Sequence, residues 1–317
     1  MTVDAALADA FPTREVETVT QAGPSWNDLN ETVRVMFADG EQVFLKLAAD
    51  GDGSRVARER AVLDYVRRHC DVTVPPVVAS ADSAPHPYLV TAPMSQQGLA
   101  PQWDQLERPE RRRALEQIGA ALATVNDRQF DRHGHIVAGD ADGLVLDTGA
   151  WSDVLVDRIE MTREIASANR FEQYFDAVID VVEAHSERLD RAPAVLVHGD
   201  PAMPNIFRSR AAIGFVDWEL AHVGDPAREL HRARDQLLES RGIDDERLVS
   251  ALHDGYRRRS GSLPPGLDDR REIYDAVRYL GTVGFVDKIA ASTDEPTDEL
   301  AASIEAEMNN RLDAVRH

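Results

Sequence analysis

Apolar and polar residues alternate along the first part of the chain, which is the pattern of strands with one buried face. The alternation runs from Glu15 to Leu47 and includes residues 32–37 and 42–47, which the turn dipeptide Asp39-Gly40 separates. From Arg55 to His69 the apolar residues recur at helical spacing instead. Two short apolar runs complete the pattern, at residues 76–79 and 88–91. These segments predict an antiparallel five-stranded sheet with one main helix.

After Met94 the pattern becomes mostly helical. Residues 111–126 are rich in Ala, Leu and Gln, and a stripe of large apolar residues follows between Phe171 and Leu189. Such a stripe is typical of a helix that packs into a core, and less so of a cofactor site. Three more helices are predicted at residues 245–258, 270–290 and 297–315. We therefore predict an α+β chain of two lobes, residues 1–94 and 95–317, joined at the polar segment Ser95–Gly98.

Three polar residues with a fixed spacing follow two short apolar runs in the second lobe. The runs at 194–197 and 213–216 are predicted strands. Asp200 and Asn205 follow the first run, and Asp217 directly follows the second. Two prolines keep the segment from Asp200 to Asn205 out of a helix. Phosphoryl transfer uses such a set: one Asp orients the attacking hydroxyl, while the Asn and the second Asp hold Mg²⁺.

The same residues belong to a longer motif, which reads His198-Gly199-Asp200, four residues, Asn205 and then Asp217-Trp218-Glu219. It resembles the aminoglycoside phosphotransferase and choline kinase family, whose motif is His-Gly-Asp, four variable residues, Asn, and then Asp-x-Glu or Asp-x-Asp. Each fixed position matches, and the resemblance extends from about Val16 to Leu230. It implies a protein-kinase-like two-lobe fold and a small-molecule kinase that uses Mg²⁺ and ATP or GTP. Asp200 would then be the catalytic base, and Asn205 and Asp217 the metal ligands.

Lys46 is a candidate for contact with the nucleotide phosphates. It lies among apolar residues of the predicted strand 42–47, where a charged side chain requires a partner. In the kinase arrangement, a Glu of the next helix orients this Lys, so Glu59 is the predicted partner. Asp64 competes for that role but lies well off the helix face of Glu59. The alternative is a lysine that extends from an edge strand into water.

The resemblance implies two further parts of the nucleotide site. The loop between the first two strands would cover the phosphates: Gly23 allows close approach of the backbone, and Ser25 or Asn27 offers hydrogen bonds, although the Gly-rich pattern is lacking. At the junction of the lobes, the carbonyl of Ala92 and the N–H of Met94 would bind the adenine base.

The composition is strongly acidic, with 56 Asp and Glu residues against 35 Lys and Arg residues and a formal net charge of −21. High negative charge keeps a protein soluble in concentrated salt, where the repulsion between carboxylates is screened beyond roughly 3 Å at 1 M. The excess of acidic over basic residues therefore favours a halophilic protein. Codon bias towards Arg is an alternative that explains the scarcity of Lys but not the acidic excess. The same charge argues against nucleic acid as a partner.

The single cysteine, Cys70, excludes an intramolecular disulfide and a cysteine metal cluster, which suits a reducing compartment. The N-terminus lacks a basic start followed by an apolar signal core, and no apolar run approaches the length of a membrane span. We expect a soluble cytoplasmic protein without a membrane partner.

The phosphate acceptor is not specified by the motif beyond a small molecule with a hydroxyl group, because related kinases phosphorylate many such alcohols. A cationic acceptor would suit acidic residues that follow the hinge, although an acidic surface explains them equally. These residues are Asp147, Asp153, Asp157 and Glu160. A choline-like acceptor would suit the aromatic faces of Trp103 and Trp151.

Two other functions fit parts of the sequence. A metal-dependent hydrolase can be built from His198, Asp200, Asp217 and His222. Such an enzyme would give Lys46 and its partner no role. A nucleotide-binding protein without catalysis would not need the complete set of base and metal residues.

His198 and Asp225 are interpreted as structural residues. The ring of His198 is expected to bond to the backbone of its own loop. Gly224-Asp225-Pro226 resembles the family segment in which the Asp braces the catalytic loop.

Overall fold

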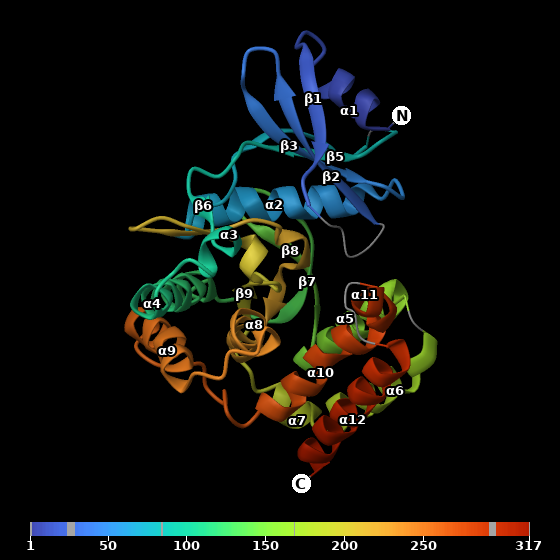
Figure 1. Ribbon diagram of the computed structural model, residues 1–317, viewed down its shortest axis with the longest axis vertical. Helices are drawn as coiled ribbons and strands as arrows, with labels where there is room; N and C mark the ends of the chain where they lie inside the picture. The colour runs from blue at the N-terminus through green and yellow to red at the C-terminus, as the bar shows by residue number, and fades with distance from the viewer. Residues whose placement is uncertain (1, 24–28, 84, 168, 292–295, 317) are drawn as a thin grey trace.

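The computed structural model describes residues 2–23, 29–83, 85–167, 169–291 and 296–316. A sheet with helices α1 and α2 lies at one end of the long axis, and a larger, mostly helical part lies at the other (Figure 1). The two chain ends lie at opposite ends of the molecule. The two-lobe α+β arrangement is therefore confirmed, while the boundary at Met94 stays a prediction.

The N-terminal part is a five-stranded antiparallel sheet, as the alternation predicts, with strand order β1-β2-β3-β5-β4. The alternating residues Val43, Leu45 and Leu47 of β3 are buried on one face of the sheet, so Lys46 points to the other face. Its pairing with Thr32 and Leu89 places Lys46 inside the sheet, not on an edge strand. The strands are β1 Val16–Gln21, β2 Asn30–Phe37, β3 Gln42–Ala48, β4 Val77–Ala81 and β5 Tyr88–Thr91.

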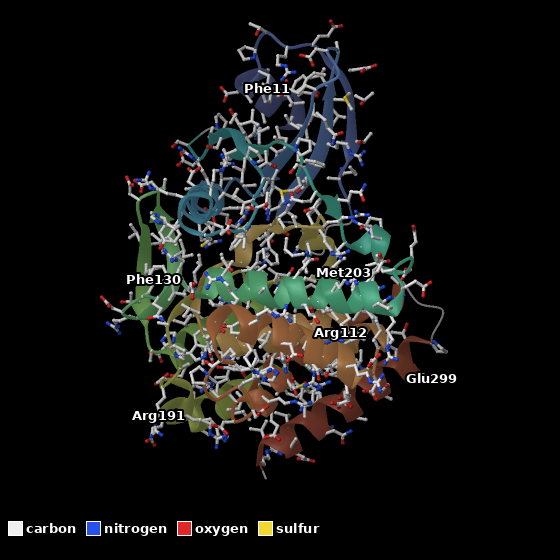
Figure 2. The ribbon with its side chains drawn as sticks, turned by 90° about the vertical axis from the view of Figure 1, so that its left-hand side faces the viewer. Phe11, Arg112, Phe130, Arg191, Met203 and Glu299 are labelled. Carbon is white, nitrogen blue, oxygen red and sulfur yellow. The ribbon has the colours of Figure 1, made fainter. Side chains whose placement is uncertain are left out.

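Helix α1 (Thr2–Ala10) covers one side of this sheet, and the hydrophobic pattern did not predict it. Its residues Ala6 and Leu7 are buried with the apolar face of the strands. Just beyond it, Phe11 packs edge-on against Phe37 with ring centroids 5.0 Å apart. Figure 2 shows Phe11 near the top of the molecule, where α1 meets the strands. The N-terminal part therefore has a small hydrophobic core of its own.

Helix α2 (Gly53–His69) lies between the sheet and the second part (Figure 1). It begins two residues before the predicted start because the side chain of Asp52 accepts a hydrogen bond from the N–H of Ser54 at 3.0 Å. The helix packs on β4 of the sheet and on β7 of the second part. It therefore connects the two parts and carries Glu59 on a buried face.

The second part contains two small sheets that carry the motif residues. Their strand orders are β11-β10-β6 and β8-β7-β12-β9. Strand β6 lies within the predicted hinge Ser95–Gly98 and pairs with β10, so this segment is tied to the second part. The hairpin of β7 and β8 was not predicted. The strands are β6 Gln97–Gly98, β7 His133–Gly139, β8 Leu144–Gly149, β9 Val195–Val197, β10 Ile206–Arg208, β11 Ile213–Phe215 and β12 His222–Gly224.

Helices form the rest of the second part. Helices α4 and α9 pack against each other, and α10 contacts α5, α6, α8 and α12. Figure 2 shows α4 crossing the molecule below the sheet, with Met203, from the segment between β9 and β10, close to its level. The helices are α3 Ala100–Trp103, α4 Arg108–Asn126, α5 Trp151–Ile165, α6 Gln173–Ala184, α7 Ser186–Leu189, α8 Pro226–Leu237, α9 Glu246–Ser260, α10 Arg271–Gly284, α11 Val286–Ala291 and α12 Thr297–Arg316.

Two predicted helices are each divided into two. His185 separates α6 from α7, and Phe285 separates α10 from α11. The apolar stripe of the first pair is buried, as predicted for a core helix. Among the described helices, none combines the length and the apolar character that crossing a membrane requires.

Candidate active site

Lys46 lies at the centre of a cluster of carboxylates. Its Nζ is 2.9 Å from Oε2 of Glu59, 2.8 Å from Oδ1 of Asp217 and 2.7 Å from Oε2 of Glu219. Strand β3 supplies the lysine and α2 supplies Glu59, while the other two carboxylates come from the turn that follows β11. Asp64 pairs instead with Arg60 on the outer side of α2. Sequence reasoning therefore selected the correct helix residue as the partner of the lysine.

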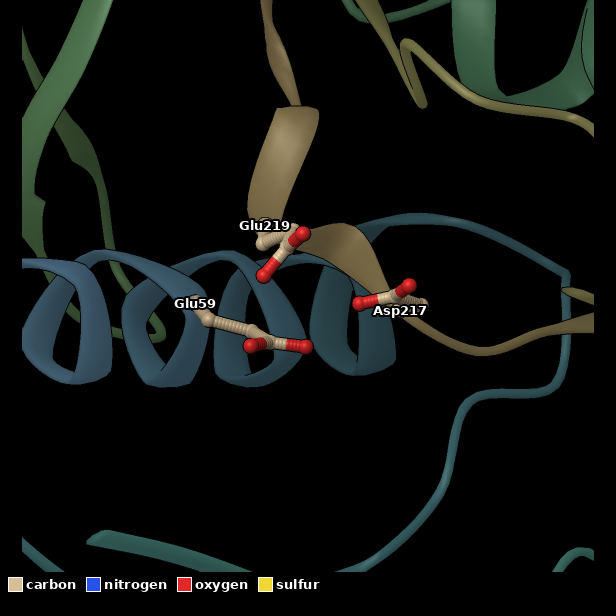
Figure 3. A group of neighbouring side chains, drawn as sticks. All are labelled: Glu59, Asp217 and Glu219. Atoms are coloured by element: carbon tan, nitrogen blue, oxygen red, sulfur yellow. The ribbon is translucent and has the colours of Figure 1, made fainter. Parts of the chain in front are cut away.

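The cluster holds three carboxylates for one lysine, so it carries an excess of negative charge. Burial alone would lower the pKa of Lys46, but Asp217, Glu59 and Glu219 raise it well above its ordinary value. Burial raises the pKa of Glu59, and the positive charge of Lys46 opposes this effect. One oxygen from each carboxylate lies within 4.8 Å of the other two (Figure 3). Such hard oxygen donors are the ligands that Mg²⁺ binds.

Asp217 has a left-handed backbone, with φ 63° and ψ 66°. Among the described residues other than glycine it alone has a positive φ. Asp and Asn tolerate this conformation better than most residues. The turn aims the carboxylate of Asp217 at Lys46, across from α2. The N–H of Val216 donates to the carbonyl of Asn205 at 3.0 Å, which brings the two predicted metal ligands into adjacent segments.

The predicted catalytic loop, residues 198–205, follows β9 and is shaped by Gly199 and Glu229. Gly199 has φ 84°, and a Cβ atom there would lie 2.2 Å from the carbonyl oxygen of Leu220, so only glycine fits. The carboxylate of Glu229, on α8, accepts the N–H of His198 at 2.8 Å and that of Gly199 at 3.1 Å. Both contacts are buried. A single glutamate of α8 therefore fixes the backbone at the start of the loop.

Asp200 is surrounded by donors. Its Oδ1 accepts hydrogen bonds from Arg232 at 2.8 Å and Gln236 at 2.6 Å, and its Oδ2 accepts one from Asn205 at 3.0 Å. Burial opposes ionisation, but Arg232 and the bond from Gln236 bring the pKa of Asp200 below its usual value. The carboxylate is therefore ionised at neutral pH and held in one orientation.

The structure gives less information on the other residues that were predicted to bind the nucleotide. Ser25 and Asn27 lie outside the described residues, and Gly23 has open space where a Cβ atom would stand. The N–H of Ala92 donates to the carbonyl of Pro76 at 2.8 Å. This bond fixes the segment between β5 and β6, from which Ala92 and Met94 would meet a base.

The histidines of the hydrolase hypothesis are engaged with the backbone. His198 bonds through Nε2 to the carbonyl of Val216 at 3.0 Å, and its Nδ1 accepts the N–H of Asp200 at 3.2 Å. Burial, with repulsion from Arg158, lowers the pKa of His222 well below its usual value. Within the described chain, the group of three metal-ligating side chains is Glu59, Asp217 and Glu219, and it contains no histidine.

Of the candidate residues for a cationic acceptor, Asp153 and Asp157 line one hollow together with Glu183, whereas the two tryptophans do not form a site. Trp103 and Trp151 are completely buried, and the indole N–H of Trp151 donates to the hydroxyl of Tyr274 at 2.8 Å. Asp157 is exposed and lies 3.2 Å from His135. Glu160 pairs with Arg163. The two tryptophans are core residues, so they are unable to form an aromatic cage for a choline-like group.

Sequence reasoning missed the residues of α8 that contact the catalytic loop. Glu229, Arg232 and Gln236 recur at helical spacing after the Asp225-Pro226 start, and this polar stripe is the signal that was available. Asp225 itself accepts the N–H of Ala227 and pairs with Arg270 at 2.7 Å. It is a scaffold residue, as expected, but Glu229 and not Asp225 braces the loop.

Comparison with known proteins gives one family and one fold. Residues 22–272 match the model of the phosphotransferase enzyme family. No curated protein sequence matches the chain. A protein described as a fructosamine-3-kinase from Thermobifida fusca is 19% identical, with a TM-score of 0.62 and coverage of 99% of this chain and 98% of that one.

Two further solved structures have the same fold. Choline kinase LicA from Streptococcus pneumoniae is 14% identical, with a TM-score of 0.62 and 98% of both chains covered. Aminoglycoside phosphotransferase APH(4)-Ia, in a ternary complex with ADP and hygromycin B, is 16% identical, with a TM-score of 0.62 and 99% of this chain and 98% of that one covered. At these identities the likeness concerns the fold.

Proposed function

Because the chain belongs to the phosphotransferase enzyme family, we propose that it is a kinase that moves the γ-phosphoryl group of ATP or GTP to a small alcohol. The observation that carries the proposal is the approach of two sets of residues from different segments. Lys46, Glu59 and Asp217 form one set, and Asp200 with Asn205 forms the other. The link between Val216 and Asn205 connects them.

Each residue has a role that its surroundings support. Lys46 would contact the nucleotide phosphates, oriented by Glu59. Asn205 and Asp217 would hold Mg²⁺, with Glu219 near enough to assist. The metal, when bound, neutralises charge on the phosphates. Gly23, Ser25, Ala92 and Met94 would complete the nucleotide site.

Asp200 would act on the acceptor. Its ionised carboxylate would accept a hydrogen bond from the acceptor hydroxyl and later take its proton. The new P–O bond forms to the acceptor oxygen as the bond from the γ-phosphorus to the bridging oxygen breaks. Arg232 and Gln236 would keep the carboxylate in position during this step.

Calorimetric titration of ATP and GTP, with and without Mg²⁺, tests the nucleotide half of the proposal. We expect metal-dependent binding that Asp217→Asn weakens at least about tenfold, since Asn retains the left-handed turn but loses the charge. Titrations should be run in both molar KCl and dilute buffer. A folded protein that binds neither nucleotide in either salt would contradict the proposal.

Asp200→Asn tests the chemical half, once release of ADP or GDP has identified an accepted alcohol. We expect turnover to fall at least about 10²-fold with little change in nucleotide affinity, because positioned acid–base groups contribute on this scale. Asp313→Asn, at an exposed position of α12, is the matched control. Near-normal turnover of the Asp200 variant would show that another group accepts the proton.

A further inference from the structure

The surroundings of Asp200 are rich in arginine, although the chain as a whole carries a net charge of −21. A pocket between α8 and α10 is lined by Arg228, Arg232 and Arg278, together with Asp235 and Tyr274. Arg232 also donates to Asp200 at 2.8 Å, so one side chain of the pocket contacts the proposed base, although Asp200 and Arg158 do not line the pocket themselves. An arginine cluster at this place is therefore a local feature and does not follow from composition.

Two of the neighbouring arginines have a carboxylate of their own and two do not. Arg232 pairs with Asp200, and Nε of Arg278 lies 2.7 Å from Oδ2 of Asp235. The side chains of Arg158, on α5, and Arg228, on α8, make no ion pair or hydrogen bond with any described residue. The Nε atom of Arg158 is buried without a hydrogen-bond partner, which is also true of other arginines such as Arg58 and Arg128. Buried guanidinium groups are normally paired, so a partner from outside the chain fits both.

The nearby glutamate does not neutralise these two arginines by contact. The carboxylate of Glu229 accepts two buried backbone N–H groups of the catalytic loop. Burial, with repulsion from Arg228, Arg232 and Arg58, lowers the pKa of Arg158 well below its ordinary value. Burial, followed by repulsion from Arg232, lowers the pKa of Arg228 to about 10. These arginines repel one another, and an anion between them would relieve the repulsion.

We propose that the acceptor alcohol carries an anionic group, a carboxylate or a phosphate, which Arg158 and Arg228 bind while the hydroxyl group meets Asp200. The inference rests on the proposed kinase function and names its substrate class. Guanidinium groups suit both anions because they donate two parallel hydrogen bonds. The burial of Trp103 and Trp151 agrees with this, since it leaves these rings unable to hold a quaternary ammonium group.

Binding measurements with matched small molecules test the inference without requiring turnover. Glycerol 3-phosphate, glycerate, inorganic phosphate and uncharged glycerol would be titrated by calorimetry at fixed ionic strength. Each titration would be made on the nucleotide-free protein and on protein saturated with Mg²⁺ and a non-hydrolysable ATP analogue. The variants are Arg158→Gln, Arg158→Lys, which keeps the charge, and Arg60→Gln, an exposed arginine of α2 as control. Circular dichroism would show that each variant is folded.

We expect at least one anionic alcohol to bind at least tenfold more tightly than glycerol, with or without the ATP analogue. Arg158→Gln should weaken that binding about tenfold or more, Arg158→Lys should weaken it less, and Arg60→Gln should leave it unchanged. Binding that the ATP analogue abolishes would assign the arginines to the donor phosphates and overturn the inference. So would equal binding of charged and uncharged compounds, or anion binding that Arg158→Gln leaves intact.

The two proposals fail separately. Absence of metal-dependent nucleotide binding would contradict the kinase function, whatever the anions do. Nucleotide binding together with turnover of uncharged alcohols only would retain the kinase function and overturn the anionic acceptor.

Discussion

Lys46 is the residue that compensates part of the negative charge in the proposed nucleotide site. It is the positive partner of three carboxylates, and its side chain is 17% exposed. Removal of one partner from a buried ion pair leaves the other charge uncompensated, which costs about 3–5 kcal/mol. The lysine therefore stabilises the ligand-free fold in addition to its proposed contact with phosphate.

We expect Lys46→Gln to lower the free energy of unfolding by about 3 kcal/mol in the absence of divalent ions. Urea denaturation measures the change, and Lys288→Gln, at the other lysine of the chain, is the control. Added Mg²⁺ should restore part of the loss, because a cation can replace the ammonium group between the carboxylates. The pairing would be refuted if the Lys46 and Lys288 variants were equally stable.

At the residue scale, the sequence predicted contacts between residues that belong to recognisable motifs. It missed the contacts that arise only when distant segments pack together. Lys46 and Glu59 lie 13 positions apart, on a strand and the next helix, and the resemblance to the kinase arrangement paired them. Arg232 lies 32 positions from Asp200 and reaches it only because α8 packs under the loop. Nothing local to Asp200 indicates that approach.

Among the elements, α8 has the strongest influence on the catalytic loop. Asp225 caps its first turn, and Glu229, one turn later, holds the backbone of His198 and Gly199. A carboxylate can accept both N–H groups, whereas a glutamine side chain has only one oxygen. The loop position therefore depends on both carboxylate oxygens of a buried glutamate.

We expect Glu229→Gln to reduce stability by about 2 kcal/mol, since one buried N–H loses a charged acceptor. Thermal or urea unfolding measures the change, and Glu187→Gln, at an exposed position of α7, is the control. Turnover should fall as well, because the loop that carries Asp200 would no longer be held at both N–H groups. A variant with the stability and turnover of the unaltered protein would show that Glu229 is dispensable.

The elements that the pattern predicted are those with a clear period. All five N-terminal strands and helix α2 were found; strands β2 and β3 alternate most clearly between buried and more exposed positions, whereas β1 is exposed throughout. The β7–β8 hairpin contains several glycines and exposed positions, so its alternation is weak. Helix α5 starts after Ala150, which makes no side-chain cap, and so its start has no sequence signal.

For the whole molecule, the excess of carboxylates controls the response to salt. We propose that the protein is adapted to concentrated salt, where repulsion between acidic groups is screened. The melting temperature should rise by roughly 5–10 °C between 0.1 M and 2 M KCl, which corresponds to about 3–7 kcal/mol for an unfolding entropy of about 2.1 cal/mol/K per residue. Differential scanning calorimetry measures it, and NaCl should act alike. A melting temperature that is independent of salt would contradict the adaptation.

The histidines control the response to acid. Burial lowers the pKa of five of them, which are His133, His135, His222, His231 and His253. Below pH 6.5 the unfolded chain therefore binds more protons than the folded one, so stability falls as pH decreases. The slope is up to about 1.4 kcal/mol per pH unit for each buried histidine.

We expect the melting temperature in 2 M KCl to decrease between pH 7 and pH 5. High salt is needed for this measurement because it removes the opposite effect, in which protonation of carboxylates relieves repulsion. An increase in melting temperature over this interval would show that the histidines are accessible to protons in the folded protein.

Helix α8 also restricts how such a protein can diversify. Its inward side chains hold the loop, position Asp200 and line the arginine pocket, all within three turns. A substitution that altered acceptor recognition here would also disturb the shared catalytic machinery. Helix α10 lines the same pocket through Tyr274, Asp275 and Arg278. New acceptor preferences should therefore arise by changes in α10, while α8 stays nearly fixed. Libraries for directed evolution are best placed in α10.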